Sequence, residues 1–165
     1  MRFLVLAAGV LGAATAARAI PINYTFNLTT LLGPSSTLTI SANEDPAVQI
    51  QLSALAGTVQ TTALGAGVLS SVGDTIDIEG GDRLIITPVV ATFVGPYTFV
   101  SATFGNVDTG NGNSGDQTIP HLDGVAGATV VLPVSPTAIS PNSVFNTSVG
   151  FQNNDGNDDF RGKLY

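Results

Sequence analysis

Residues 48–53 read VQIQLS, a strict alternation of aliphatic and polar side chains. Successive side chains of a β-strand point to opposite faces, so this stretch predicts a strand with one buried face and one solvated face. Residues 22–28 (INYTFNL) and 145–151 (FNTSVGF) repeat the pattern, with aromatic residues among the members of the apolar face. This period of two predicts an all-β protein.

Turn-forming pairs recur at intervals of about ten residues and separate short runs rich in Val, Ile, Thr and Phe. Examples are Gly33-Pro34, Asp45-Pro46, Gly73-Asp74 and Gly95-Pro96. Short strands at this spacing are typical of an antiparallel β-sandwich, and we expect one of jelly-roll or Ig-like type.

Two segments depart from simple alternation. Residues 84–94 are almost continuously apolar, which predicts a central strand that either crosses between the sheets or bends at Pro88. Residues 54–72 are rich in Ala and Leu, so a short helix is an alternative there. Their glycines disfavour a helix, and we expect strands and turns.

The first 19 residues have the features of a signal peptide. Met1-Arg2 is followed by an apolar run and then by Ala17-Arg18-Ala19, a small-x-small cleavage pattern. The apolar run is shorter than the roughly 20 residues that span a bilayer. A buried N-terminal strand or helix is the alternative. We therefore expect residues 20–165 to form one mature domain, secreted or held at the cell surface.

The chain contains no cysteine, so disulfides do not hold this fold together. Small exported domains of animals usually contain disulfides, and their absence favours a bacterial source. Loss of residues 1–19 leaves three cations, Arg83, Arg161 and Lys163, against 12 acidic residues. Nucleic acids and anionic membranes bind clustered cations, so we expect neither as a partner. No later stretch is long and apolar enough to insert into a membrane.

No pattern of catalytic or cofactor-binding residues stands out. The single histidine, His121, lies two residues before Asp123, but no nucleophile motif accompanies it. Glu44 and Glu79 are the only glutamates, and neither lies in a recognisable motif. We expect a protein that is not an enzyme, with a small secreted hydrolase as the least favoured alternative.

Calcium is the one cofactor for which the sequence offers ligands. Asn153, Asp155, Asn157 and Asp159 place carboxylate and amide oxygens at alternate positions of one loop. Phe160 stands where an EF-hand loop needs glycine, so the loop is of another kind. Residues 108–117 (DTGNGNSGDQ) form a second, looser loop of the same composition. Ordinary turns are also built from Asp, Asn and Gly, so a plain turn stays open.

Three Asn-x-Ser/Thr sequences begin at Asn23, Asn27 and Asn146, all on expected solvated faces. They match the acceptor pattern for N-glycosylation. A sugar-binding surface usually stacks aromatic rings on the sugar, and this chain has no tryptophan and only three tyrosines. A glycan-binding module is therefore an alternative without direct support.

Two local arrangements are also predicted. Residues 80–82 should form a three-residue hairpin loop that sets Glu79 opposite Arg83. Residues 159–165 should form a strand at a sheet edge, with Arg161 and Lys163 facing solvent.

These observations predict a non-catalytic protein of a cell surface or extracellular matrix, with a structural, adhesion or assembly role. Its partners would be further copies of itself or a surface or matrix component. A calcium- or glycan-binding module is the second hypothesis.

Overall fold

The computed structural model describes residues 23–63, 65–70, 78, 81–89, 96–105, 116–132, 137–140, 142–154 and 163–164. Within these residues every regular element is a β-strand and every strand pairing is antiparallel, so the protein is all-β. The same residues contain no helix with the length and apolarity needed to cross a membrane. The expected signal peptide, residues 1–19, lies outside them.

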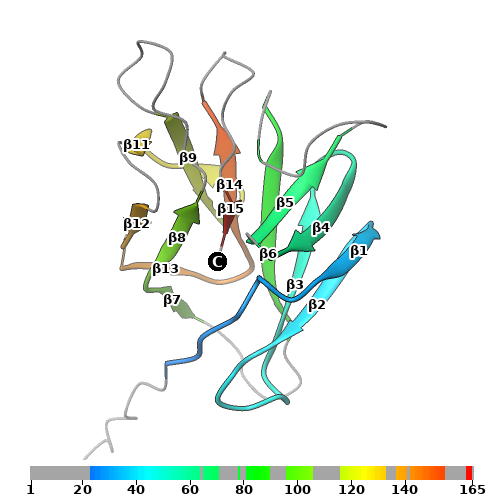
Figure 1. Cartoon of the computed structure of the whole chain (residues 1–165). Coiled ribbons are helices and arrows are strands. Elements are labelled where there is room, and N and C mark those ends of the chain that lie inside the picture. The colour runs from blue at the N-terminus through cyan, green and yellow to red at the C-terminus, as the bar shows by residue number, and fades with distance from the viewer. Residues whose placement is uncertain are drawn as a thin grey trace, which may run out of the picture.

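The strands form two large sheets and one small sheet (Figure 1). The six-stranded sheet has the order β1 (Leu32–Ser35), β4 (Thr58–Thr62), β5 (Gly65–Leu69), β15 (Lys163–Leu164), β8 (Ala102–Gly105) and β12 (Thr137–Ile139). The seven-stranded sheet has the order β10 (Val125–Ala126), β9 (Asp116–Leu122), β14 (Val149–Asn153), β6 (Arg83–Val89), β3 (Gln49–Ala54) and β2 (Thr37–Ser41), and β11 (Val130–Leu132) also pairs with β9. The small sheet pairs β13 (Ser143–Phe145) with β7 (Tyr97–Phe99).

One hydrophobic core lies between the two large sheets. The rings of Phe104 on β8 and Phe151 on β14 meet edge to face with centroids 5.1 Å apart, and both are fully buried. Val59 of the six-stranded sheet and Leu52 of the seven-stranded sheet belong to the same core cluster. A shared core between two facing sheets is consistent with a β-sandwich.

Several strand predictions are confirmed. Ile50 and Leu52 on β3 are 7% and 0% exposed, as the alternation of residues 48–53 requires. Within residues 54–72, β4 and β5 pair as a hairpin instead of forming a helix.

Strand β6 occupies the centre of the seven-stranded sheet, between β14 and β3. Its interior position confirms the prediction for the described part of residues 84–94. The Leu55 N–H bonds the Arg83 carbonyl, so the backbone groups of Arg83 face β3. Backbone groups of a strand alternate in direction, so those of residues 85 and 87 also face β3, and those of Pro88 face β14. The pairing with β14 ends at Ile86, so the missing N–H of Pro88 removes no bond of the sheet.

The first predicted strand is only partly regular. Tyr24 and Phe26 are half-buried and Leu28 is buried, whereas the intervening residues are exposed, so the faces are as expected. Only one bridge, between Phe26 and Ala42, joins this segment to a sheet. The segment leaves the seven-stranded sheet there because the following residues cross to β4 of the other sheet.

The edge position predicted for the C-terminal strand is wrong, whereas the direction of the Arg161 and Lys163 side chains lies outside what the structure describes. β15 does not lie at an edge, because Leu164 pairs with Ala66 of β5 on one side and with Phe104 of β8 on the other. A strand between two neighbours uses backbone groups on both sides and completes the six-stranded sheet. The predicted pairing of Glu79 with Arg83 is not tested, because Glu79 and Gly80 lie outside the described residues. Ile78 and Leu84 are both buried in the core.

Candidate functional site

The ends of the two Asp- and Asn-rich loops lie side by side at one end of the seven-stranded sheet. The Asn154 N–H donates to the Gln117 carbonyl (3.1 Å), and Asn154 Nδ2 donates to Gln117 Oε1 (3.2 Å). Gln117 ends the segment 108–117, and Asn154 belongs to the segment 153–159. The end of the first loop and the start of the second, about 40 residues apart in sequence, therefore lie next to each other.

Asn153 is the described member of the expected calcium ligands. It is 4% exposed and lies opposite Thr118 in the register of β14 and β9. Its N–H donates to the carbonyl of Asp82 at 3.3 Å. Asp82 is thus a further acidic residue at this end of the sheet, which the local sequence pattern did not indicate.

The remaining expected ligands, Asp155, Asn157 and Asp159, lie outside the described residues. Among the residues that the structure does describe, no group of three His, Cys, Asp or Glu side chains is placed to hold a metal ion. The contact between Asn153 and Asp82 joins backbone groups, so the described residues place two residues with oxygen-bearing side chains at one end of the sheet.

A second polar cluster lies on the outer face of the seven-stranded sheet and joins three strands. Gln152 Oε1 accepts a hydrogen bond from Arg83 Nη2 (2.9 Å) and lies 2.9 Å from His121 Nε2. The Gln152 side-chain oxygen is an amide oxygen and can only accept hydrogen bonds. His121 therefore donates to it through Nε2–H. His121 is 5% exposed, and its buried Nδ1 has no hydrogen-bond partner among the described residues.

Gly150 makes room for this cluster. A Cβ atom at position 150 would lie 3.4 Å from both the Cδ of Arg83 and the Cβ of His121. The two side chains therefore close over the glycine from neighbouring strands and meet at Gln152. The only described partner of the single histidine is a neutral amide, not a carboxylate or a nucleophile.

A two-residue turn, Asp123-Gly124, joins β9 to β10. Both residues have positive φ (52° and 82°), as a type I′ turn requires. The Asp123 carboxylate accepts the N–H groups of Asn146 (2.9 Å), Thr147 (2.6 Å) and Ser148 (3.2 Å). The Thr147 N–H, joined by its two neighbours, holds the pKa of Asp123 well below its ordinary value.

This contact corrects the prediction of one strand over residues 145–151. β13 ends at Phe145 and β14 begins at Val149, because Asp123 takes the three intervening N–H groups. The Asp-Gly pair is a recognised hairpin signal, so the turn itself was detectable in the sequence. Its partner, 24 residues away, was not.

The three asparagines of the Asn-x-Ser/Thr sequences are exposed, as expected, but their surroundings differ. Asn146 Nδ2 donates to Asp123 Oδ2 (3.2 Å), so its amide is held by the turn. Asn27 Oδ1 accepts from the N–H (3.0 Å) and the hydroxyl (2.6 Å) of Thr29. These bonds use the side-chain oxygen of Asn27, so its amide nitrogen is the group that can bond other partners.

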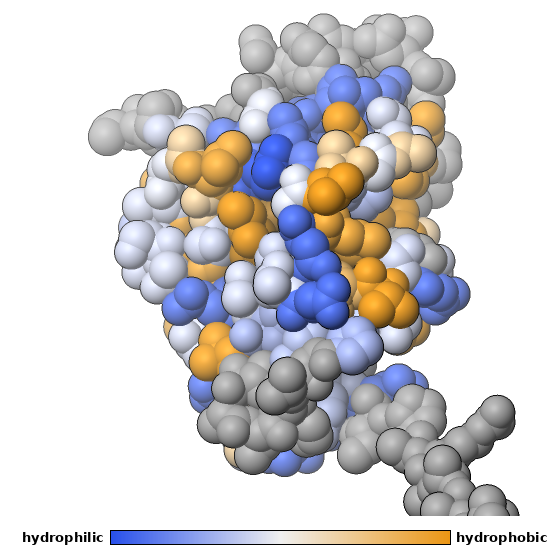
Figure 2. All heavy atoms as spheres, turned by 180° about the vertical axis from the view of Figure 1, so that it is seen from behind, coloured by the Kyte–Doolittle hydropathy of each residue, from blue (hydrophilic) through white to orange (hydrophobic). Residues whose placement is uncertain are grey.

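Aliphatic side chains are exposed at an edge of the seven-stranded sheet. Val125 on β10 and Val131 on β11 are 71% and 44% exposed. On the face of the molecule shown in Figure 2, apolar patches alternate with hydrophilic residues. Val144 of the small sheet and Val100, the residue after β7, are also exposed.

Comparison of the chain with protein-family models, with curated proteins and with solved structures yields no match.

Proposed function

We propose that this chain is an exported, non-catalytic β-sandwich protein of a cell surface or extracellular matrix, with a structural or adhesive role exercised by assembly. The finer fold type that we propose is a jelly-roll or Ig-like sandwich. Neighbours in the sheets that are distant in sequence, such as β6 between β3 and β14, support that type. The signal-like N-terminus supports export.

The observation that carries this proposal is the edge formed by β10 and β11, which pairs with no strand other than β9 among the described residues. Residues 125–132 (VAGATVVL) contain no charged residue and no proline, and Val125 and Val131 are exposed. Sheet edges usually carry charges, proline or a covering segment, because a bare edge pairs with strands of other molecules. An apolar, uncharged edge therefore favours association with a second copy.

The surroundings of His121 support a non-catalytic role. A general base needs a proton donor of the reaction within hydrogen-bond reach, and usually an acid that orients the ring. Here Nε2 is engaged by Gln152, and burial keeps the ring from solvent.

Size-exclusion chromatography and negative-stain microscopy of residues 20–165 test the proposal. We expect oligomers that grow with protein concentration, and we expect Val131→Lys to reduce them by placing a charge on the edge. Leu55→Lys is the matched control, since Leu55 is also exposed but lies in the turn between β3 and β4. A chain that stays monomeric at every concentration contradicts the proposed assembly.

A calcium-binding module is the second candidate, and the contact between Asn154 and Gln117 favours it. That contact gathers the described ends of two oxygen-rich segments, and Asn153 brings Asp82 to the same end of the sheet. Repeating the chromatography with calcium and then with a chelator separates the two candidates, because only the second requires the ion.

A further inference from the structure

The outer edge of β2 has backbone groups that no other strand of the described residues uses. The Ala42 N–H bonds the Val48 carbonyl (2.8 Å), so in this antiparallel pair the groups of residues 38, 40 and 42 face β3. The groups of Thr39 and Ser41 then face away from the sheet. The neighbouring Asn43 N–H, which also faces this way, bonds the Thr25 carbonyl (2.9 Å).

The chain that covers this edge at one end then moves away from it. Phe26 bridges to Ala42, but by Leu32 the chain has joined the six-stranded sheet, where the Leu32 N–H bonds Thr61 Oγ1 (3.0 Å). This segment diverges from β2 (Figure 1). Between the two lies a shallow, open groove of about 350 Å³. Its lining includes Asn27, Thr30, Leu32, Thr39, Ser41 and Asn43.

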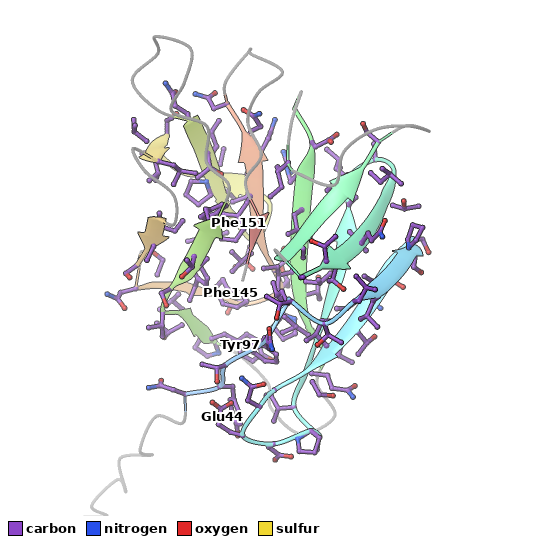
Figure 3. All side chains as sticks on the ribbon, in the orientation of Figure 1. Glu44, Tyr97, Phe145 and Phe151 are labelled. Atoms are coloured by element: carbon purple, nitrogen blue, oxygen red, sulfur yellow. The ribbon has the colours of Figure 1, made fainter. Side chains whose placement is uncertain are left out.

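The chain passes beyond both ends of the groove. At one end the Thr25 N–H and hydroxyl both donate to the carboxylate of Glu44, the former at 2.8 Å, next to the Phe26 bridge. Figure 3 shows the position of Glu44. At the other end a single residue, Ser36, joins β1 to β2. A partner strand needs an edge that is open along its length, so this groove fits a compact ligand better than a strand from a second copy.

The lining has the chemistry of a site for a neutral polyol. Its polar residues are uncharged hydroxyl and amide groups, which both donate and accept hydrogen bonds, as sugar hydroxyls do. Leu32 and Ile40 add apolar surface against which the C–H face of a sugar ring can pack. The described residues that line the groove include no carboxylate and no cation, although the chain as a whole is strongly acidic. The Glu44 carboxylate near one end accepts from Thr25 and is not part of the lining.

We propose that the groove between β2 and residues 27–32 binds one unit of a neutral saccharide, held by the side chains of Thr39 and Asn27 and by the outward-facing N–H groups of Thr39 and Ser41. This site lies on β2, at the opposite edge of the seven-stranded sheet from β10 and β11. The proposal goes beyond assembly and does not depend on it.

Titration of the purified chain with neutral methyl glycosides tests the site, followed in two-dimensional ¹H–¹⁵N spectra. The probes are the methyl glycosides of glucose, galactose, mannose and N-acetylglucosamine, each to about 50 mM, which detects millimolar dissociation constants. We expect at least one of them to shift the Thr39 and Ser41 amides in a saturable way. Glucuronate, which carries a negative charge, should bind no more tightly than the weakest-binding of the neutral glycosides.

Thr39→Val and Thr37→Val form the matched pair of variants. Both residues are exposed threonines of β2, but only Thr39 lines the groove. We expect Thr39→Val to weaken binding about tenfold, a typical loss for one hydrogen bond, and Thr37→Val to leave it within about twofold. Equal effects of the two variants overturn the proposal.

Two further outcomes overturn it. One is the absence of shifts at Thr39 and Ser41 with every neutral glycoside. The other is a shift of the Thr39 and Ser41 amides that changes with protein concentration and not with added glycoside. Such a shift would show that this edge is a contact between copies. Val131→Lys, which tests assembly at the other edge, should leave saccharide binding unchanged, so the two proposals can fail separately.

Discussion

The carboxylate of Asp123 lies 2.6 Å from the backbone nitrogen of Thr147, and the same oxygen accepts the Thr147 hydroxyl at 2.9 Å. The turn between β9 and β10 is thereby bonded to the link between β13 and β14. Three consecutive N–H groups that a strand would use are satisfied by one side chain. This contact sets the point at which β14 begins.

Asp123→Asn should lower stability in a manner that depends on pH. Asparagine suits the positive φ of this turn, so the change removes the charge and spares the turn. The folded-state pKa of Asp123 is lowered, so its contribution is present above the unfolded pKa, about 3.9, and is lost as pH falls through the folded value. Urea unfolding at pH 7 and pH 3 should show a gap between wild type and variant that narrows at pH 3. Asp45→Asn, at an exposed turn, is the control, and a gap independent of pH contradicts the assignment.

Gly57→Ala should be strongly destabilising. Gly57 has φ of 80°, and a Cβ atom there would lie 2.4 Å from the Leu69 carbonyl oxygen. Strain and overlap together should cost about 3 kcal/mol or more in the free energy of unfolding. Gly124→Ala, with positive φ but open space, should cost about 1 kcal/mol, and Gly33→Ala within about 0.5 kcal/mol. Thermal or urea unfolding of the three variants checks this order, and a Gly57→Ala protein as stable as Gly33→Ala contradicts it.

A double-mutant cycle on Phe104→Leu and Phe151→Leu should show a coupling of about 0.5–1.5 kcal/mol. The two rings meet edge to face across the sheets, and such pairs contribute beyond their buried area. The control cycle pairs Phe151→Leu with Ile40→Val on β2, three strands away, where the effects should add. Additivity in the first cycle would show that the two sheets do not meet at these rings.

Gln152→Leu should destabilise the protein by about 1–3 kcal/mol, because it leaves Arg83 and the buried His121 without their shared acceptor. Gln49→Leu is the control, since the Gln49 amide makes one longer bond, to Ser41 at 3.3 Å. Long-range ¹H–¹⁵N spectra should also show the neutral His121 ring protonated at Nε2. A ring protonated at Nδ1 would mean that Gln152 does not accept from it.

Calcium should raise the melting temperature of the chain, and Asp155→Ala combined with Asp159→Ala should abolish the rise. An ion that binds only the folded protein stabilises it by mass action. The loop lacks a bidentate glutamate, so we expect a dissociation constant of about 1 mM. Glu44→Ala with Asp45→Ala removes two acids elsewhere and should keep the rise. The absence of any shift at about 10 mM calcium, roughly ten times that constant, would leave residues 153–159 as an ordinary turn.

The local pattern of the chain was sufficient to predict its class and the faces of its strands. Buried Ile50 and Leu52 follow from a period of two that any strand obeys, and it requires no knowledge of the partner strand. The interior position of β6 followed in the same way from the continuous apolar run that begins at Leu84. The oxygen-rich composition of the two loops was also evident, although the sequence did not show that Gln117 and Asn154 meet.

The tertiary structure alone decided where strands end and which of them pair. The alternation over residues 145–151 continues through Asn146–Ser148, yet the strand is broken there because a carboxylate from a distant turn competes for its N–H groups. The cations of the C-terminal segment are typical of an edge strand. β15 nevertheless lies between β5 and β8, because its backbone pairs with both of them. The alternation of apolar and polar residues shows which face of a sheet each side chain points to. Hydrogen-bond partners depend on segments far apart in the chain, which the alternation does not show.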